Sequence, residues 1–162
     1  MKQPEIYVIL HNVRSVHNVG SVFRTADAVG VSKIFLTGYT PSPEDRFGRP
    51  RKDISKTALG AELSVPWKSY LQVGSVLRNL SADGVKIIAV EQSPKAKNYS
   101  KLKISDKTAF IFGNEVAGLS GSILKKADEI VELPMRGKKE SLNVSVAAGV
   151  VLFKAFENRG FQ

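Results

Sequence analysis

The sequence contains no cysteine and only two histidines, His11 and His17. Without cysteine the chain has no disulfide, no thiolate metal site and no cysteine nucleophile. Two histidines also leave no cluster with the spacing of a metal site. We therefore expect no bound metal, and any chemistry must depend on other side chains.

Long apolar runs are also missing. No run approaches the roughly 20 residues that cross a bilayer. The first residues, Met1 to Glu5, lead directly into a strand-like run without the features of a signal peptide. We expect no membrane association and a cytoplasmic location. A length of 162 residues with 43% hydrophobic residues predicts a single domain spanning residues 1–162.

Acidic residues are scarce relative to basic ones. The chain has 15 Asp and Glu against 24 Lys and Arg, a net charge of +9 and a pI near 9.8. A solubilising surface is one explanation, but many of the basic residues gather in two loop-like stretches. Such clusters favour a polyanionic partner and are typical of a phosphate-binding surface. The clustered residues are Arg46, Arg49, Arg51, Lys52 and Lys56 in the first stretch, and Arg136, Lys138 and Lys139 in the second.

Short apolar, β-branched runs alternate with stretches of helical period. This alternation predicts an α/β fold with a mostly parallel sheet and helices on both faces. Residues 39–53 hold three prolines and are expected to form a long loop. The predicted strands are Ile6–Leu10, Lys33–Leu36, Val85–Val90, Ala109–Phe112 and Ile130–Leu133, and the predicted helices are Asn18–Val29, Leu71–Ala82, Ser122–Ala127 and Asn143 to about Asn158.

The last predicted helix is apolar on nearly every face. A helix on a monomer's surface would show one apolar stripe, so this one should be buried on more than one side. In a short chain the second covering surface is expected to be another copy of the subunit, in a homodimer. Gly149, in the middle of the helix, fits the close approach of another helix.

Several common nucleotide and metal motifs are absent, including G-x-G-x-x-G, the P-loop and H-E-x-x-H. Three other segments each follow a predicted strand and lead into a helix, where α/β folds bind ligands. They are His17-Asn18-Val19-Gly20-Ser21-Val22-Phe23-Arg24-Thr25-Ala26-Asp27, Phe112-Gly113-Asn114-Glu115-Val116-Ala117-Gly118-Leu119-Ser120, and Leu133-Pro134-Met135-Arg136-Gly137 with Ser141-Leu142-Asn143-Val144-Ser145.

In order and spacing, these segments resemble the three motifs of the SpoU or TrmH family within the SPOUT superfamily of RNA methyltransferases. The resemblance spans most of the chain. It implies a C-terminal trefoil knot, although knots are rare among folds. It further implies S-adenosylmethionine (SAM) as methyl donor, a ribose 2′-hydroxyl of tRNA or rRNA as acceptor, and a homodimer whose active site takes residues from both subunits.

The resemblance also assigns roles to residues. Arg24 becomes the catalytic arginine, with Asn18 and Glu115 assisting it, and Arg159 joins the basic clusters as an RNA-binding residue. The residues matched to the donor site are Val90, Glu91, Gly113, Asn114, Gly118, Leu133, Ser141, Leu142 and Asn143. Arg24 would act as a base or, since guanidinium rarely loses its proton, as a phosphate clamp and oxyanion stabiliser.

Each residue also has an ordinary structural explanation. Asn18 and Asn143 could cap helices, Arg24 could pair with Asp27, and Arg159 could oppose a helix dipole. Two other functions compete with ribose methylation. One is a catalytically inactive knotted dimer that binds RNA or SAM, and the other is methylation of a base by a SPOUT enzyme.

Overall fold

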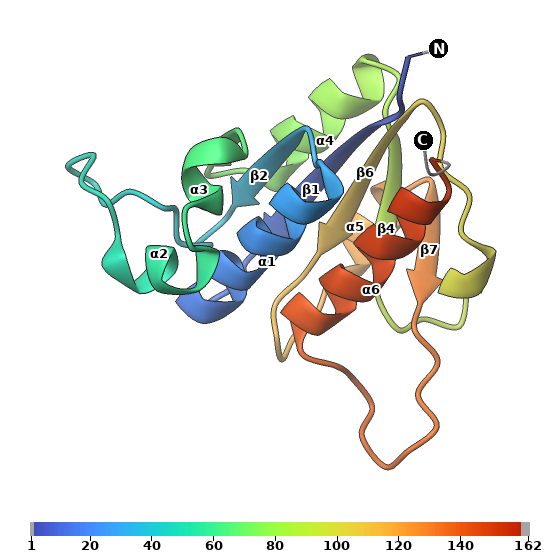
Figure 1. Cartoon of the computed structure of the whole chain (residues 1–162). Coiled ribbons are helices and arrows are strands. Elements are labelled where there is room, and N and C mark those ends of the chain that lie inside the picture. Colours follow the sequence, from blue (N-terminus) through green and yellow to red (C-terminus); the bar gives the residue numbers. More distant parts are fainter. Residues whose placement is uncertain (1, 160–162) are drawn as a thin grey trace.

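Seven parallel strands form one sheet in the structure, a computed structural model that describes residues 2–159. The sheet order is β3-β2-β1-β6-β4-β7-β5, and every neighbouring pair is parallel, which confirms the predicted α/β class (Figure 1). The strands are β1 (Glu5–His11), β2 (Lys33–Thr37), β3 (Trp67–Tyr70), β4 (Lys86–Val90), β5 (Lys97–Asn98), β6 (Lys107–Phe112) and β7 (Glu129–Glu132).

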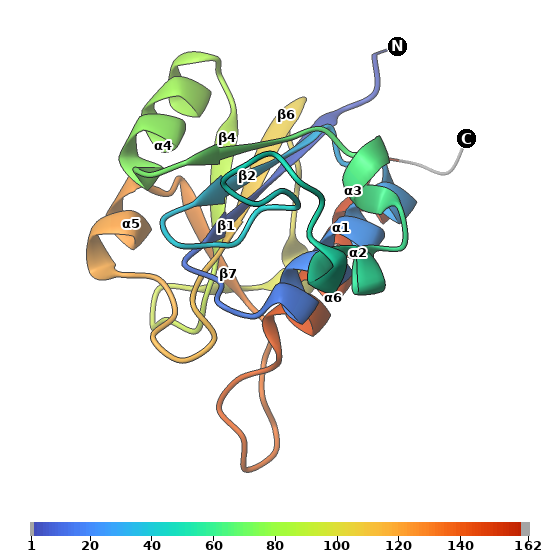
Figure 2. The same ribbon diagram turned by 90° about the vertical axis from the view of Figure 1, so that its left-hand side faces the viewer.

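Helices cover both faces of this sheet, as predicted (Figure 2). Helices α1, α2, α3 and α6 share one hydrophobic core, and α4 and α5 share the other. The pleat explains the division, because successive strand residues point to opposite faces: Val8 and Leu10 enter the first core and Ile9 enters the second. The helices are α1 (Val16–Val29), α2 (Lys52–Ala58), α3 (Ala61–Ser64), α4 (Val73–Ala82), α5 (Gly121–Lys126) and α6 (Val144–Glu157), with a 3₁₀ turn, η1 (Tyr99–Lys101).

All five predicted strands and all four predicted helices are confirmed, with ends shifted by at most two residues. Strands β3 and β5 and helices α2 and α3 were not predicted. The predicted loop at residues 39–53 contains an isolated bridge between Glu44 and Pro50 and ends at Lys52, where α2 begins. No helix among residues 2–159 is long and apolar enough to cross a membrane.

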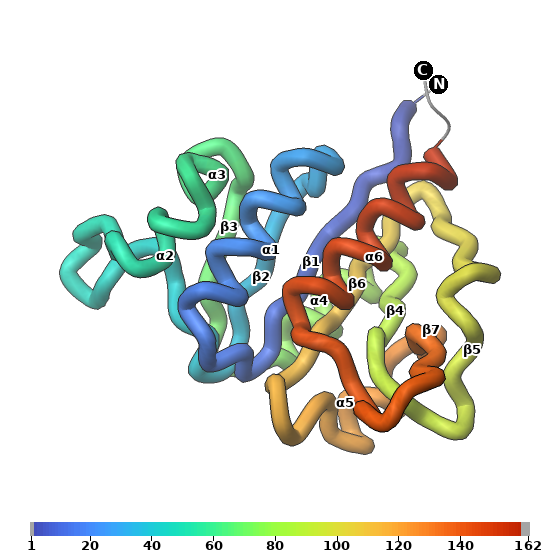
Figure 3. The backbone as a smooth tube through the Cα atoms, turned by 60° about the horizontal axis from the view of Figure 1, so that its bottom comes forward, coloured from blue at the N-terminus to red at the C-terminus, as the bar shows by residue number. Residues whose placement is uncertain are grey.

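Helix α6 packs against α1 on one side and η1 on the other (Figure 3). Its Ala148, Val151 and Leu152 are fully buried, whereas Val146 and Phe153 remain 51% and 48% exposed. A Cβ atom added at Gly149 would meet no atom within 4 Å. Apolar groups therefore lie on both the inward and the outward side of α6.

Candidate active site

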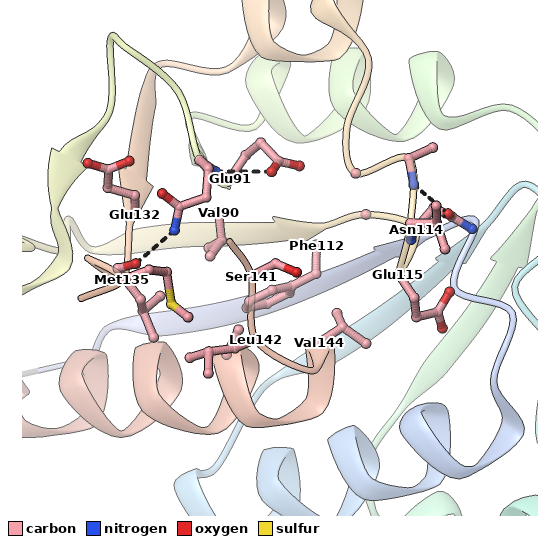
Figure 4. A pocket seen from close by; sticks show the side chains of 17 residues that line it. Val90, Glu91, Phe112, Asn114, Glu115, Glu132, Met135, Ser141, Leu142 and Val144 are labelled. Carbon is pink, nitrogen blue, oxygen red and sulfur yellow. Dashed lines mark hydrogen bonds between the residues drawn. The ribbon is translucent and has the colours of Figure 1, made fainter. Parts of the chain in front are cut away.

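A cleft lies where β4, β6 and β7 end, at the carboxyl edge of the parallel sheet (Figure 4). We call it the strand-end cleft. The chain after each of these strands, together with the start of α6, supplies its walls. The lining residues are Val90, Glu91, Gln92, Phe112, Gly113, Asn114, Glu115, Val116, Ala117, Gly118, Glu132, Leu133, Met135, Ser141, Leu142, Val144 and Ala147.

Eight of the nine residues matched to the donor site line this cleft, and Asn143 is the exception. The sequence did not single out Gln92, Glu132 or Ala147 as site residues. Gln92 and Glu132 directly adjoin matched residues at the ends of β4 and β7, so their positions in the sequence could have identified them as lining residues. Ala147 gave no such signal, because it reaches the cleft from the first turn of α6.

The segment from Gly113 to Gly118 is a closed turn. The side-chain oxygen of Asn114 accepts hydrogen bonds from the amides of Val116 and Ala117 at 2.9 and 2.8 Å. A Cβ atom at Gly113 would lie 2.6 Å from the Gly118 carbonyl, so this close approach requires glycine. The backbone of the turn is thereby held at the edge of the cleft.

Glu91 ties the end of β4 to this turn. Its Oε2 accepts a hydrogen bond from the Leu119 amide at 2.8 Å, and a Cβ atom on Gly118 would lie only 2.2 Å from the same oxygen. Gln92 makes the matching link to β7, since its side-chain amide donates to the Leu133 carbonyl at 2.7 Å. Two adjacent side chains thus join the ends of three strands.

Glu115 connects the turn to the start of α1. Its carboxylate accepts hydrogen bonds from the amides of Arg14 and Ser15, both at 3.1 Å, and from the Asn18 side chain at 3.3 Å. Burial by itself raises the pKa of Glu115, but the hydrogen bonds from its own amide, Ser15, Arg14 and Asn18 together bring it below its ordinary value. The carboxylate is therefore charged where it meets α1.

Asn18 and Asn143 extend this connection to α6. Asn143 donates from Nδ2 to Oδ1 of Asn18 at 3.1 Å, and its own Oδ1 accepts from the Ser145 amide at 2.9 Å. The predicted cap role of Asn143 is confirmed. The cap interpretation of Asn18 is wrong, because Ser15 caps α1 and Asn18 lies inside the helix. We call Asn143, Asn18 and Glu115 the amide–carboxylate chain.

Arg24 is exposed on α1 and does not line the strand-end cleft. Its guanidinium makes no hydrogen bond or ion pair with any residue between 2 and 159. The predicted pairing with Asp27 is wrong, since the Asp27 carboxylate instead accepts from Ser64 Oγ at 2.8 Å. Within one chain, the structure brings Asn18 and Glu115 together and leaves Arg24 apart from them.

The first basic cluster lies in the segment between β2 and α2 and in α2 itself. Arg49 and Arg51 pair with Asp45 and Asp53 at 2.9 and 2.8 Å, and Lys52 is exposed at the start of α2. Arg46 is also exposed there. The second cluster, Arg136, Lys138 and Lys139, is exposed on the segment between β7 and α6.

Arg159 lies apart from both clusters. Its Nη1 donates to the Val29 carbonyl at 3.1 Å, at the carboxyl end of α1, and burial lowers the pKa of its guanidinium. The predicted dipole role thus applies to α1 rather than to the helix that precedes Arg159. No group of three or more potential metal ligands occurs within residues 2–159.

A family model described as the SpoU rRNA Methylase family matches residues 5–153. The chain belongs to this family. All three motif segments of this SpoU-family chain, including the strand-end cleft and the amide–carboxylate chain, lie within the matched range.

Two relatives align with nearly the whole of this chain. A 23S rRNA (guanosine-2′-O-)-methyltransferase RlmB of Neisseria meningitidis is 33% identical over 98% of this chain and 61% of its own length. A tRNA (guanosine(18)-2′-O)-methyltransferase of Escherichia coli is 30% identical over 98% of this chain and 66% of its own length. The SpoU-family chain thus spans less than two thirds of either relative.

A solved structure shares the fold of this chain. The AdoMet-bound rRNA methyltransferase of Sinorhizobium meliloti superposes with a TM-score of 0.87 at 28% identity. The match covers 99% of the SpoU-family chain and 58% of that protein. Nearly the whole of this chain therefore corresponds to one part of the Sinorhizobium meliloti protein.

Proposed function

We propose that this chain transfers a methyl group from SAM to a ribose 2′-hydroxyl of tRNA or rRNA. The observation that carries the proposal is the link between the strand-end cleft and α1 through Asn143, Asn18 and Glu115. These are family-motif positions on three segments far apart in the chain. The relatives include both a tRNA and an rRNA 2′-O-methyltransferase.

The chemistry of the strand-end cleft fits SAM. Phe112, Leu133 and Leu142 offer apolar walls for an adenosine, and the Gly113–Gly118 turn offers backbone groups for its polar edges. Three carboxylates, those of Glu91, Glu115 and Glu132, line the cleft, and its described lining includes no Lys or Arg. In a chain of net charge +9, such a site suits the positive sulfonium of the donor.

Eight lining residues would hold the donor directly, and Asn143 would act by fixing the turn beside them. When bound, SAM supplies an electrophilic methyl group for in-line displacement by the ribose oxygen. The direct set is Val90, Glu91, Gly113, Asn114, Gly118, Leu133, Ser141 and Leu142.

Arg24 would serve the acceptor rather than the donor. Guanidinium groups in general rarely give up their proton, so we assign Arg24 to grip a neighbouring phosphate and to stabilise charge developing on the 2′-oxygen. The phosphate or a water then takes the hydroxyl proton. Asn18 and Glu115 fix the start of the helix that carries Arg24.

A homodimer would bring Arg24 to a cleft. Arg24 lies outside the cleft of its own chain, and Val146 and Phe153 leave apolar surface uncovered on α6. The open space at Gly149 leaves room for a second helix. On this basis we propose that each active site combines the strand-end cleft of one subunit with Arg24 of the other.

We further propose that the C-terminal part is threaded into a trefoil knot. Strand β7 lies between β4 and β5, and Asn158 at the end of α6 donates to the Leu102 carbonyl, just beyond η1, at 2.8 Å. These contacts place the last helix against the segment that leads from β4 to β6 (Figure 3). Tracing residues 91–106 and 133–143 in a crystal structure tests the crossing.

The two basic clusters would bind the RNA backbone. The members that we assign to RNA binding are Arg46, Arg49, Arg51 and Lys52 in the first cluster, and Arg136, Lys138 and Lys139 in the second. Arg159 supports the end of α1, so any RNA contact from it would be secondary to that contact. An RNA substrate also accords with a cytoplasmic location.

Three measurements test the activity. Calorimetry with SAM should show binding, and no binding at millimolar donor would contradict the proposal. Host RNA incubated with the protein and labelled donor should then gain a methyl group. Nuclease digestion with mass spectrometry distinguishes a ribose methyl from a base methyl, and a modified base would favour the second SPOUT activity. Donor binding without any transfer would favour an inactive binding protein.

The role of Arg24 is tested by two substitutions. We expect Arg24→Ala to lower the turnover rate by about 100-fold, as removal of one oxyanion donor does elsewhere. Arg24→Lys should keep part of the activity with an unshifted pH profile, because lysine still supplies a positive charge. Unchanged turnover in Arg24→Ala would exclude any catalytic role for this residue.

A further inference from the structure

The segment between β2 and α2 projects from the body of the molecule beside α2 (Figure 1). We call residues 39–51 the arm. At its tip Phe47 is 66% exposed, between two arginines in the sequence Arg46-Phe47-Gly48-Arg49. Single exposed apolar residues are common and need no explanation by themselves. Phe47 differs from such residues in two ways. The backbone of the tip is held by hydrogen bonds, and two guanidinium groups lie close to the ring.

The tip is a hydrogen-bonded turn. The Asp45 carboxylate accepts from the amides of Phe47 and Arg49 at 2.8 and 3.0 Å, and the Asp45 amide donates to the Arg49 carbonyl at 2.8 Å. Gly48 has a positive φ of 75°, which a side chain would strain. The bridge between Glu44 and Pro50 closes the turn. The aromatic ring is therefore presented on an ordered backbone.

Two guanidinium groups lie against this ring. The Arg46 and Arg49 guanidinium carbons are 4.7 and 4.9 Å from the Phe47 ring centroid. Arg49 is also oriented by its ion pair with Asp45 at 2.9 Å. An aromatic ring close to two guanidinium groups combines stacking surface with positive charge. Proteins use the same combination to hold unpaired nucleobases and their phosphates.

The base of the arm is tied to the strand-end cleft. The Tyr39 amide donates to Asn12 Oδ1 at 3.1 Å, and the Tyr39 hydroxyl accepts from Asn114 Nδ2 at 3.0 Å. Asn114 belongs to the turn that lines the cleft. Because β2 is parallel to β4, β6 and β7, the arm leaves the sheet at the same edge as the cleft.

We propose that the arm tip stacks on an unpaired nucleobase of the RNA substrate, with Phe47 as the stacking surface and Arg46 and Arg49 holding the adjacent phosphates. This inference rests on the proposed RNA-methylating function and specifies the form of RNA that the arm recognises. The arm tip should bind single-stranded RNA, because bases within a duplex expose no face for stacking.

The test compares Phe47→Leu, which keeps apolar bulk and removes the ring, with Leu63→Ala, at an 87% exposed site on α3. The probe is a fluorescein-labelled single-stranded RNA of about 12 nucleotides, alone or annealed to its complement. We expect Phe47→Leu to weaken single-strand binding by about tenfold and to leave duplex binding within about twofold. Leu63→Ala should change neither.

A fluorescent substitution reports the contact directly. The chain has one tryptophan, Trp67, so the emission gained in Phe47→Trp belongs to the new indole. Single-stranded RNA should quench this added emission, and duplex RNA should not. Unchanged single-strand binding in Phe47→Leu, equal loss for both RNAs, or no quenching would overturn the proposal. So would a loss of dimer mass in Phe47→Leu, which would make the tip a contact between subunits.

The proposed methyl-transfer activity is tested independently of the stacking site. Donor calorimetry and methyl transfer by the wild-type protein do not require the Phe47 substitutions. The wild-type protein could fail to bind SAM and to transfer a methyl group, while its Phe47 variants still show weaker binding of single-stranded RNA alone. That result would contradict the proposed enzyme function and support the stacking site.

Discussion

At the scale of single residues, Asn18 decides how the candidate site is assembled. Its side chain donates to Glu115 with one atom and accepts from Asn143 with the other. An amide is suited to this position because it carries a donor and an acceptor on the same planar group. No aspartate or alanine could make both contacts.

Replacement of Asn18 by aspartate removes the donor that Glu115 uses. The new carboxylate would face a charged carboxylate, so we expect Asn18→Asp to lower the free energy of unfolding by about 1 to 3 kcal/mol at pH 7. Part of the loss should return as the pH falls and one of the two carboxyls takes up a proton. Urea denaturation measures this, with Asn79→Asp on α4 as control. Equal effects in both variants would show that the contact contributes nothing.

Glu115 gives the site a pH dependence of known sign. Its pKa in the folded protein is below the ordinary value of 4.5, so its ionised form stabilises the fold above that pH. The contribution should disappear as the pH falls through the lower folded pKa. We expect the stability difference between wild type and Glu115→Gln to be largest at neutral pH and to shrink below about pH 4.5. Thermal denaturation across this range checks it, and a constant difference would contradict it. Glu44→Gln, at an exposed site, is the control.

The individual site residues were more predictable than their contacts. Motif spacing indicated Asn18, Glu115 and Asn143, although the hydrogen bond between Asn18 and Asn143 spans 125 positions. Local spacing cannot reveal such a contact, because it depends on the order of strands in the sheet. The absence of an Arg24–Asp27 pair was equally unpredictable, since Ser64 competes for Asp27 only in the folded chain.

At the scale of elements, the start of α6 combines two roles in one side chain. Asn143 Oδ1 caps the helix while its Nδ2 holds Asn18. Substitution by aspartate keeps the first role and removes the second, whereas alanine removes both.

We expect Asn143→Asp to retain the stability of the wild type and Asn143→Ala to lose about 1 kcal/mol. Both variants should bind SAM more weakly, by about fivefold or more, because the Ser141–Leu142 turn loses its tie to α1. Thermal denaturation measures the first effect and calorimetry the second. Wild-type donor affinity in Asn143→Asp would show that the Asn18 contact is structural only.

The elements that sequence analysis missed share a physical cause. Strands β3 and β5 are the two edges of the sheet, and the two residues of β5 are both exposed polar side chains. Helix α2 buries only Ile54 and Ala58, and α3 buries only Ala61. Elements that bury few apolar side chains show little hydrophobic periodicity in their sequence. The structure of the edge strands is decided instead by pairing with the rest of the sheet. The central strands could be predicted because they are buried on both faces and therefore form apolar runs in the sequence.

At the scale of the whole molecule, the uncovered apolar side of α6 is the surface through which we expect two subunits to associate. A charge placed there would be buried in the proposed dimer and exposed in a monomer. We expect Val146→Glu and Phe153→Glu each to weaken the dimer by at least tenfold, and Leu71→Glu, at another exposed apolar site, to leave it intact. Sedimentation measures the mass. A wild-type protein that stays monomeric would contradict the prediction.

Strand order also determines when the chain can fold. Strand β6 lies between β1 and β4, and β7 lies between β4 and β5, so each later strand enters between two earlier ones. During synthesis, the first 100 or so residues therefore lack the strands that join β1 to β4 and β4 to β5. Unpaired strand edges stay exposed until the last third of the chain emerges. Folding should accordingly be slow and late, and this protein should depend on protection from aggregation while it is being made.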